Sequence, residues 1–290
     1  MWTETLDRKW PKGFFILYTF ILHGLGSAII TGGIEFAVAY GMYRHPKHHD
    51  QVKMWGFPYT LAGDLVVTIF VQIIATWFIE ELFVGWDWFL NSSCHIPFWQ
   101  NKSKGRVALW LDVKTCTFIP RRQIKQEYIK NHNGIGLFWY VIRLQFFRSV
   151  KEKQIEPKFN LKIFIIWIIR RLIRSVIISL ICFLIIWPLT LGIMTARSLD
   201  HVHNDFIFKD YPFPQVLKVI FGAVLAFLTT PITVITIIAR NDNYLRLVET
   251  NEIQDPLYQF KDEIDSGEQD EDASNDVRDE DEEGKDSEES

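Results

Sequence analysis

The chain has 290 residues, of which 48% are hydrophobic and 15% are aromatic, and its net charge is −4. Residues 251–290 hold 18 Asp and Glu against 3 Lys and Arg, so the preceding part carries +11. This segregation and apolar content exclude an ordinary water-soluble domain, and no nucleotide-binding, zinc-protease or serine-hydrolase motif occurs. We expect no nucleic-acid partner.

Four apolar stretches are each long enough to cross a bilayer, which takes about 20 apolar residues. They predict an all-α membrane protein, a four-transmembrane-helix bundle embedded in a lipid bilayer. The stretches are residues 14–43, 57–79, 175–196 and 216–239. The sequence therefore divides into an N-terminal transmembrane hairpin, a basic loop, a C-terminal transmembrane hairpin and an acidic tail, in residues 1–90, 91–174, 175–250 and 251–290.

The first stretch carries small residues at four-residue spacing, which let helix backbones approach closely in lipid. Gly24, Ala28 and Gly32 form one such face, and residues 33, 37 and 41 form another. Two faces of this kind predict that the first helix is central and touches more than one neighbour.

Ionisable and amide side chains inside the first two stretches are the main candidates for a site. Glu35 and Asp64 fall at similar depth near the same end of their helices, whereas His23 and Gln72 lie deeper. An unpaired carboxylate in hydrocarbon is costly, so each should face the bundle interior. Three interpretations stay open, namely an interhelical salt bridge, a cation or proton site, and placement among the lipid headgroups.

Two cations are candidate partners for these carboxylates. Arg197 follows the third stretch and Lys218 opens the fourth, which places both at the end of the bundle that carries Glu35 and Asp64.

The same hairpin resembles a known family. Residues 24–43, GLGSAIITGGIEFAVAYGMY, and residues 57–80, FPYTLAGDLVVTIFVQIIATWFIE, resemble a fungal family of multi-pass membrane proteins of unknown function. The resemblance lies mainly in the first 90 residues and is weaker through the third and fourth stretches. It implies a fungal origin and a shared hairpin type, and it implies no activity.

The loop between the hairpins sets the predicted orientation. Residues 80–174 hold 17 Lys and Arg, and cytoplasmic loops collect these residues, so the loop and both termini should be cytosolic. An endomembrane such as the endoplasmic reticulum is favoured over the plasma membrane. Residues 134–150 and 159–174 predict interfacial helices, through which the basic loop 102–174 would contact anionic lipid; the alternative is that they pack beneath the bundle.

Histidines gather in the two connections on the other side. They are His45, His48 and His49 in one connection, and His201 and His203 in the other. Imidazoles brought together by two loops would suit zinc or another divalent metal; the alternative is that they are solvated loop residues and the protein has no cofactor. A di-iron enzyme is disfavoured, because only the H-x-x-H-H group at 45–49 matches its histidine boxes.

The tail, residues 251–290, has too few apolar residues to offset the entropy of ordering. We expect it to be disordered, either as a solubilising appendage or as a docking segment for a basic protein partner.

These features favour a non-enzymatic adaptor or assembly factor acting through its basic loop and acidic tail. The alternative is a small transporter or channel subunit that uses Glu35 and Asp64 and forms a homo-oligomer, because four spans are few for a complete transporter. A second alternative is a metal-dependent, lipid-modifying membrane enzyme, with the loop histidines as its metal ligands.

The charge asymmetry gives a topology that labelling can test. Cysteines introduced at positions 48 and 205 should react with an impermeant thiol reagent from the non-cytosolic side, and one at position 120 should not. A glycan on Asn91 or Asn101 would contradict this orientation, because both sequons lie in the loop predicted to be cytosolic.

Overall fold

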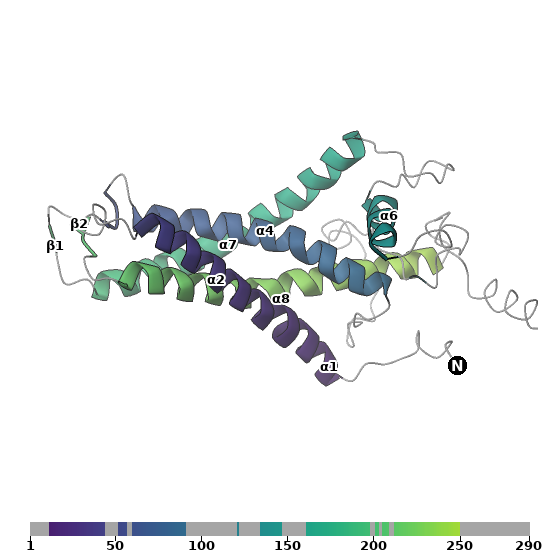
Figure 1. The fold of residues 1–290 in the computed structure, drawn as a ribbon, viewed down its shortest axis with the longest axis horizontal. Helices are drawn as coiled ribbons and strands as arrows, with labels where there is room; N and C mark the ends of the chain where they lie inside the picture. The colour runs from purple at the N-terminus through teal and green to yellow at the C-terminus, as the bar shows by residue number, and fades with distance from the viewer. Residues whose placement is uncertain are drawn as a thin grey trace, which may run out of the picture.

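A computed structural model describes residues 12–43, 52–56, 60–90, 121, 134–146, 161–197, 201–202, 205–208 and 212–249. This part of the chain is almost entirely helical (Figure 1). Four helical segments are long and apolar enough to cross a membrane. They are Gly13–Tyr43, Leu61–Phe89, Phe164–Ala196 and Phe213–Leu245.

The first of these segments is not a uniform α-helix. It begins with α1 (Lys12–Ile16), continues as the π-helix η2 (Leu17–Leu25) and ends as α2 (Gly26–Tyr43). We call the three together the first span. A π-helix of nine residues is unusual, and such wide turns occur frequently at functional sites.

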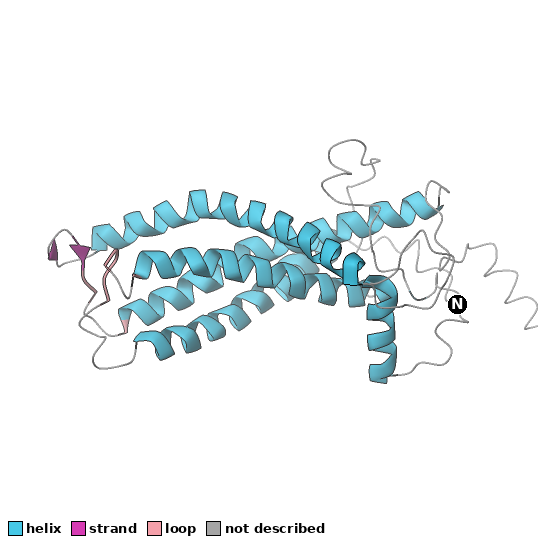
Figure 2. Ribbon diagram, turned by 90° about the horizontal axis from the view of Figure 1, so that it is seen from above, coloured by secondary structure: helices cyan, strands magenta, loops and turns pink. Residues whose placement is uncertain are grey.

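The other long helices are α4 (Leu61–Phe89), α7 (Leu161–Arg197) and α8 (Phe213–Glu249). In Figure 1, α4 and α8 run lengthwise with α2, whereas the N-terminal part of α7 diverges from them; the short strands lie at one end of the bundle and α1 lies towards the other. The shorter helix α6 (Gly134–Phe146) lies across the long axis of the bundle in Figures 1 and 2.

The central helix is α8, not the first span. Helix α8 packs against η2, α2 and α4, and α7 packs against α4. In the most apolar window of α8 56% of residues are buried, against 28% in the first span. Gly24 and Gly32 lie against α8, as a Cβ on Gly24 would be 3.3 Å from Pro231 Cγ and one on Gly32 3.6 Å from Ala223 Cβ. The second small-residue face has no such contact at Gly33 or Gly41, so the prediction of a central first helix is wrong. The first span does touch two neighbours, α8 and α4, as the sequence predicted.

Three helices are longer than the sequence predicted, and one of them, α8, continues to Glu249, ten residues beyond the predicted end of the fourth stretch. Helix α4 continues to Phe89, ten residues beyond the predicted end of the second stretch. Helix α7 begins at Leu161, so residues 161–174, expected within a separate interfacial helix, are its first turns. No proline or glycine occurs in residues 161–187, so nothing in the sequence stops the helix between the two segments.

The two connections that follow α2 and α7 meet at one end of the bundle. The strands β1 (His201–Val202) and β2 (Asp205–Phe206) pair antiparallel. The Met54 backbone N–H donates to the Phe206 carbonyl at 3.0 Å, and the Phe208 N–H donates to the Val52 carbonyl at 2.9 Å. These bonds hold the described parts of both connections together.

An ionic triad joins the three helices α4, α7 and α8. Glu81 of α4 accepts from Arg171 of α7, with Nη2 at 3.3 Å from Oε1, and the same oxygen contacts Arg240 of α8. All three side chains are buried. Arg171 also lies over the Trp167 ring, 5.3 Å from its centroid. Because the two guanidinium groups share one carboxylate, the triad fixes the helices relative to one another.

Replacing the shared carboxylate should destabilise the bundle strongly. Glu81→Gln removes the anion that both buried guanidinium groups contact, and breaking a buried pair costs about 3–5 kcal/mol. The matched control is Glu80→Gln, one residue earlier, where the new amide still bonds to His23. Thermal unfolding of the purified protein should show a loss of several degrees for Glu81→Gln and a much smaller loss for Glu80→Gln. Equal losses would contradict the role of the triad.

Candidate functional site

Polar side chains follow each other along the facing sides of the first span and α4. On the first span they recur every four residues, a spacing that keeps them on one side of a helix. On α4 the same spacing runs from Asp64 through residues 68, 72 and 76 to Glu80. We call the members that line one shared cavity the polar seam. They are His23, Ser27, Thr31 and Glu35 on the first span, and Gln72, Thr76, Glu80 and Asp87 on α4.

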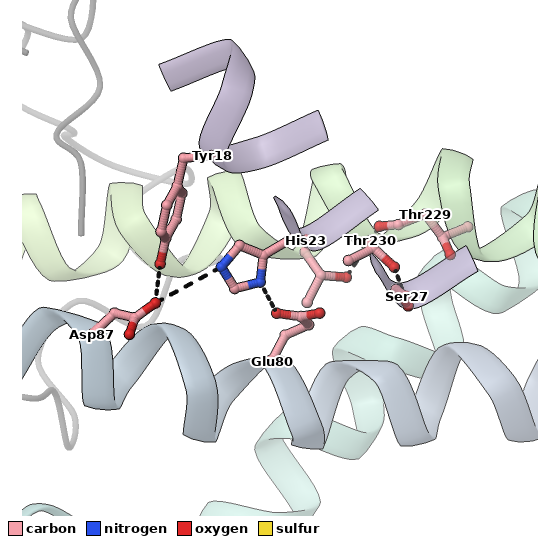
Figure 3. Close-up of polar contacts among 8 residues, drawn as sticks. Tyr18, His23, Ser27, Glu80, Asp87, Thr229 and Thr230 are labelled. Atoms are coloured by element: carbon pink, nitrogen blue, oxygen red, sulfur yellow. Dashed lines mark hydrogen bonds and ion pairs between the residues drawn. The ribbon is translucent and has the colours of Figure 1, made fainter. Parts of the chain in front are cut away.

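One end of the seam is built around His23, which the π-helix η2 presents to α4 (Figure 3). Its Nδ1 lies 2.7 Å from Glu80 Oε2, and both side chains are buried. Its Nε2 faces Asp87 Oδ2 at 3.9 Å, and Tyr18 donates a hydrogen bond to that same oxygen at 2.8 Å. A histidine is thus held between two carboxylates, an arrangement that can take up and pass on a proton.

The other end is built around Lys218 of α8. Its Nζ lies 2.9 Å from Asp64 Oδ1 and 3.3 Å from Glu35 Oε2. Tyr43 donates to the second Asp64 oxygen at 2.8 Å. Gly222 lies beneath Glu35, since a Cβ there would be 2.6 Å from Glu35 Cγ. The lysine therefore joins the first span and α4 to α8.

Between these ends the seam is joined to α8 by hydrogen bonds. Thr230 donates to Ser27 Oγ at 3.0 Å (Figure 3), and the Gln72 amide nitrogen donates to the Gly222 carbonyl at 3.0 Å. Because a carbonyl can only accept a hydrogen bond, the NH2 group of the Gln72 amide must face it. Its other atom, Oε1, is buried and has no hydrogen-bond partner in the described part of the chain.

The seam lines a cavity of about 410 Å³ between the first span and α4. The buried His23, Gln72, Thr76 and Glu80 form its inner wall. One side is open, and there the lining residues are exposed and apolar. These are Leu22, Ile30, Ile34, Val71, Ile79 and Phe83. The site is thus a polar wall that is reached through an apolar opening.

The structure brings four of the residues singled out from the sequence to this seam or its ends. They are His23, Glu35, Asp64 and Gln72. Of the two candidate partners for the carboxylates, Lys218 contacts both. Arg197 is the last residue of α7, and its side chain lies outside the described residues.

The predicted metal ligands are not placed by the structure. Three of them, at 45, 48 and 49, and His203 lie outside the described residues, and of His201 only the backbone in β1 is described. Within the described ranges, no group of three or more His, Cys, Asp and Glu side chains could hold a metal ion. The zinc site stays a prediction.

Sequence reasoning missed five of the eight residues of the seam, namely Ser27, Thr31, Thr76, Glu80 and Asp87. Glu80 and Asp87 follow the predicted end of the second stretch at residue 79, so they were counted with the loop. Tyr18 gave no signal, because an apolar stretch does not reveal the wide turns of a π-helix. The four-residue repeat that begins at Asp64 is the pattern that could have revealed Glu80 as a lining residue.

Comparison with known proteins establishes the family. The chain is 31% identical over 252 residues to the uncharacterised protein YHL026C of Saccharomyces cerevisiae, covering 79% of this chain and 78% of that protein. The chain belongs to this fungal family. An uncharacterised Schizosaccharomyces pombe protein, C594.02c, is 32% identical over 220 residues, covering 74% of this chain. The chain spans only 36% of that member's length.

A family model described as a protein of unknown function, DUF2456, matches residues 143–238. This match covers α7 and most of α8, whereas the sequence resemblance to the fungal family was placed mainly in residues 24–80. No solved structure matches the chain significantly. The family relationship therefore brings no activity, and the site must be interpreted from its own chemistry.

The lysine between the two carboxylates gives a stability prediction. Lys218→Met leaves Glu35 and Asp64 facing each other without a cation, at a cost of about 3–5 kcal/mol for a broken buried pair. Asp64→Asn should cost less, since Lys218 keeps Glu35 as its partner. Thermal unfolding of the two purified variants should rank Lys218→Met as the less stable. The reverse order would show that the lysine does not hold this end of the seam together.

Proposed function

We propose that this protein is an integral membrane protein that moves protons across the membrane along the polar seam. The observation that carries the proposal is the cavity that connects His23, Glu80 and Asp87 at one end with Glu35 at the other. Chains of Asp, Glu and His inside membrane helices are typical of proton relays in pumps and transporters.

The length of the seam supports this proposal. Asp64, at the Lys218 end, and Asp87 are 23 residues apart on α4, or about 35 Å at 1.5 Å per residue, and the part of α4 that lines the cavity, from Val71 to Asp87, covers about 24 Å of this. The hydrocarbon core of a bilayer is about 30 Å thick. If α4 crosses the membrane, the two charged ends of the seam lie near its two surfaces, with hydroxyl and amide groups between them.

The cavity also supplies what a relay needs between its fixed groups. A water occupies roughly 30 Å³ of liquid, so a cavity of about 410 Å³ has room for several. Ser27, Thr31, Gln72 and Thr76 offer these waters hydrogen-bonding partners along the wall. A seam that only held helices together would pair its own polar atoms, whereas Gln72 Oε1 is left available.

The charge asymmetry of the sequence gives the proposed orientation. With both termini cytosolic, the His23 end faces the cytosol and the Lys218 end faces the opposite side. Helix α6, which lies crosswise near the cytosolic end, would then rest on the anionic leaflet. Because four spans are few for a transporter, we expect more than one copy to assemble.

The adaptor role favoured by the sequence alone depends on the basic loop and the acidic tail. Most of the loop and all of residues 251–290 lie outside the described residues. The enzyme alternative depends on loop histidines whose side chains are likewise undescribed. Both stay predictions, and the seam favours transport over either.

Proton movement can be measured directly after reconstitution into liposomes. With an imposed membrane potential and a pH-sensitive dye inside, the wild-type protein should acidify or alkalinise the lumen according to the sign of the potential. Glu80→Gln should abolish this flux, because it removes the carboxylate that His23 contacts. Thr76→Val should reduce the flux, since it removes a hydroxyl from the cavity wall.

The matched control is Thr190→Val. Thr190 lies on α7 away from the cavity and bonds to the Ile186 carbonyl at 2.8 Å. This variant should conduct like wild type. A wild-type protein without flux under either polarity, or equal flux in wild type and Glu80→Gln, would contradict the proposal.

A further inference from the structure

We propose that the cavity between the first span and α4 binds an organic amine cation with an apolar body. The amine would be a second transported species, coupled to the proposed movement of protons, and this role rests on the proposed function. Binding itself is argued from the charge, the hydrogen-bonding atoms and the shape of the cavity.

The charge of the lining favours a cation. Three carboxylates line the cavity, those of Glu35, Glu80 and Asp87, and His23 is the only basic residue among the lining residues. Lys218 contacts Glu35 from α8 but does not line the cavity. An anion would therefore meet like charge at both ends.

The polar atoms left over on the wall are hydrogen-bond acceptors. Gln72 is 7% exposed, and its Oε1 has no hydrogen-bond partner within the described ranges. In the tautomer that donates from Nδ1 to Glu80, His23 Nε2 is also an acceptor, and it has no hydrogen-bond partner in the described part of the chain. An ammonium group supplies up to three N–H donors and the matching charge.

The open side of the cavity favours an apolar body on that amine. The exposed rim consists of aliphatic and aromatic side chains, among them Ile30, Ile34 and Phe83. In a membrane this rim would face the acyl chains, so a ligand dissolved in the bilayer could enter sideways. A small inorganic cation gains nothing from such an opening, whereas an alkyl chain or ring buries apolar surface there.

Aromatic side chains line the cavity close to Asp87 in the chain. Phe83 and Trp86 precede Asp87 on α4 by four residues and by one residue, and all three line the cavity. A cation over an aromatic face is stabilised by the electrons of the ring. The volume of about 410 Å³ also lies within the range of roughly 300–1,000 Å³ that is usual for small-molecule sites.

Equilibrium binding of radiolabelled dodecylamine to the full chain in lipid nanodiscs tests this assignment, with empty nanodiscs as the measure of partition into lipid. We expect saturable binding of the amine, binding of dodecanol weaker by about tenfold or more, and no saturable binding of dodecanoate. Phosphatidylethanolamine added to the nanodiscs should compete weakly, because its phosphate would lie beside the carboxylates. Strong competition by this lipid would overturn the assignment to a free amine.

Variants connect binding to the cavity. Asp87→Asn and Gln72→Leu should each weaken amine binding, with Asp87→Asn losing about tenfold or more because a charged partner is removed. Thr190→Val should bind like wild type. Thermal unfolding of each variant shows whether it is folded, and an Asp87→Asn protein that is folded and binds normally would overturn the proposal.

The proposal of amine binding and the proposal of proton movement can be contradicted independently of each other. Flux that is lost in Glu80→Gln, together with no saturable amine binding in wild type, would overturn the amine site and leave the proton path standing. Saturable, Asp87-dependent binding without flux would support the amine site and remove the amine's proposed role as a transported species.

Discussion

The cost of keeping charged side chains among apolar helices governs how this bundle is built. An isolated charge is expensive in such surroundings, so each must find a partner or water. Helix α8 supplies the cations Lys218 and Arg240 near its two ends, and both pair with carboxylates of α4. This requirement explains why α8 is central, since it is the helix on which both the first span and α4 meet their counter-charges.

Two buried carboxylates of α4 have different roles. Glu81 has two guanidinium partners and does not line the cavity, which suits a structural pair. Its neighbour Glu80 contacts a single histidine and lines the cavity. Consecutive residues of an α-helix point about 100° apart, so α4 can present one carboxylate to the core and the next to the seam. We interpret Glu81 as a residue that stabilises the bundle and Glu80 as a residue of the functional site.

The sequence predicts the four long helices because hydropathy alone fixes where about 20 apolar residues run together. It also predicts that Glu35 and Asp64 lie together, since helix length sets their depth, and the structure places Lys218 between them. The sequence does not predict features that depend on contacts between helices. Glu80 and Glu81 lower the local hydropathy, so the sequence predicts that the second stretch ends before them. Their basic partners on the other helices make these two charges tolerable, and α4 continues through them. The π-helix around His23 has no sequence signature at all.

The central claim is that the seam is a polar, water-accessible wall inside the bundle, and thiol accessibility tests it most directly. Single cysteines at Ser27, Thr31 and Thr76, in a background without native cysteines, should react with a small cationic thiol reagent in membranes. Cysteines at Ile29 and Val67, which are exposed but do not line the cavity, should face lipid and stay unreactive. Reaction at all five positions, or at none of the three seam positions, would contradict the account.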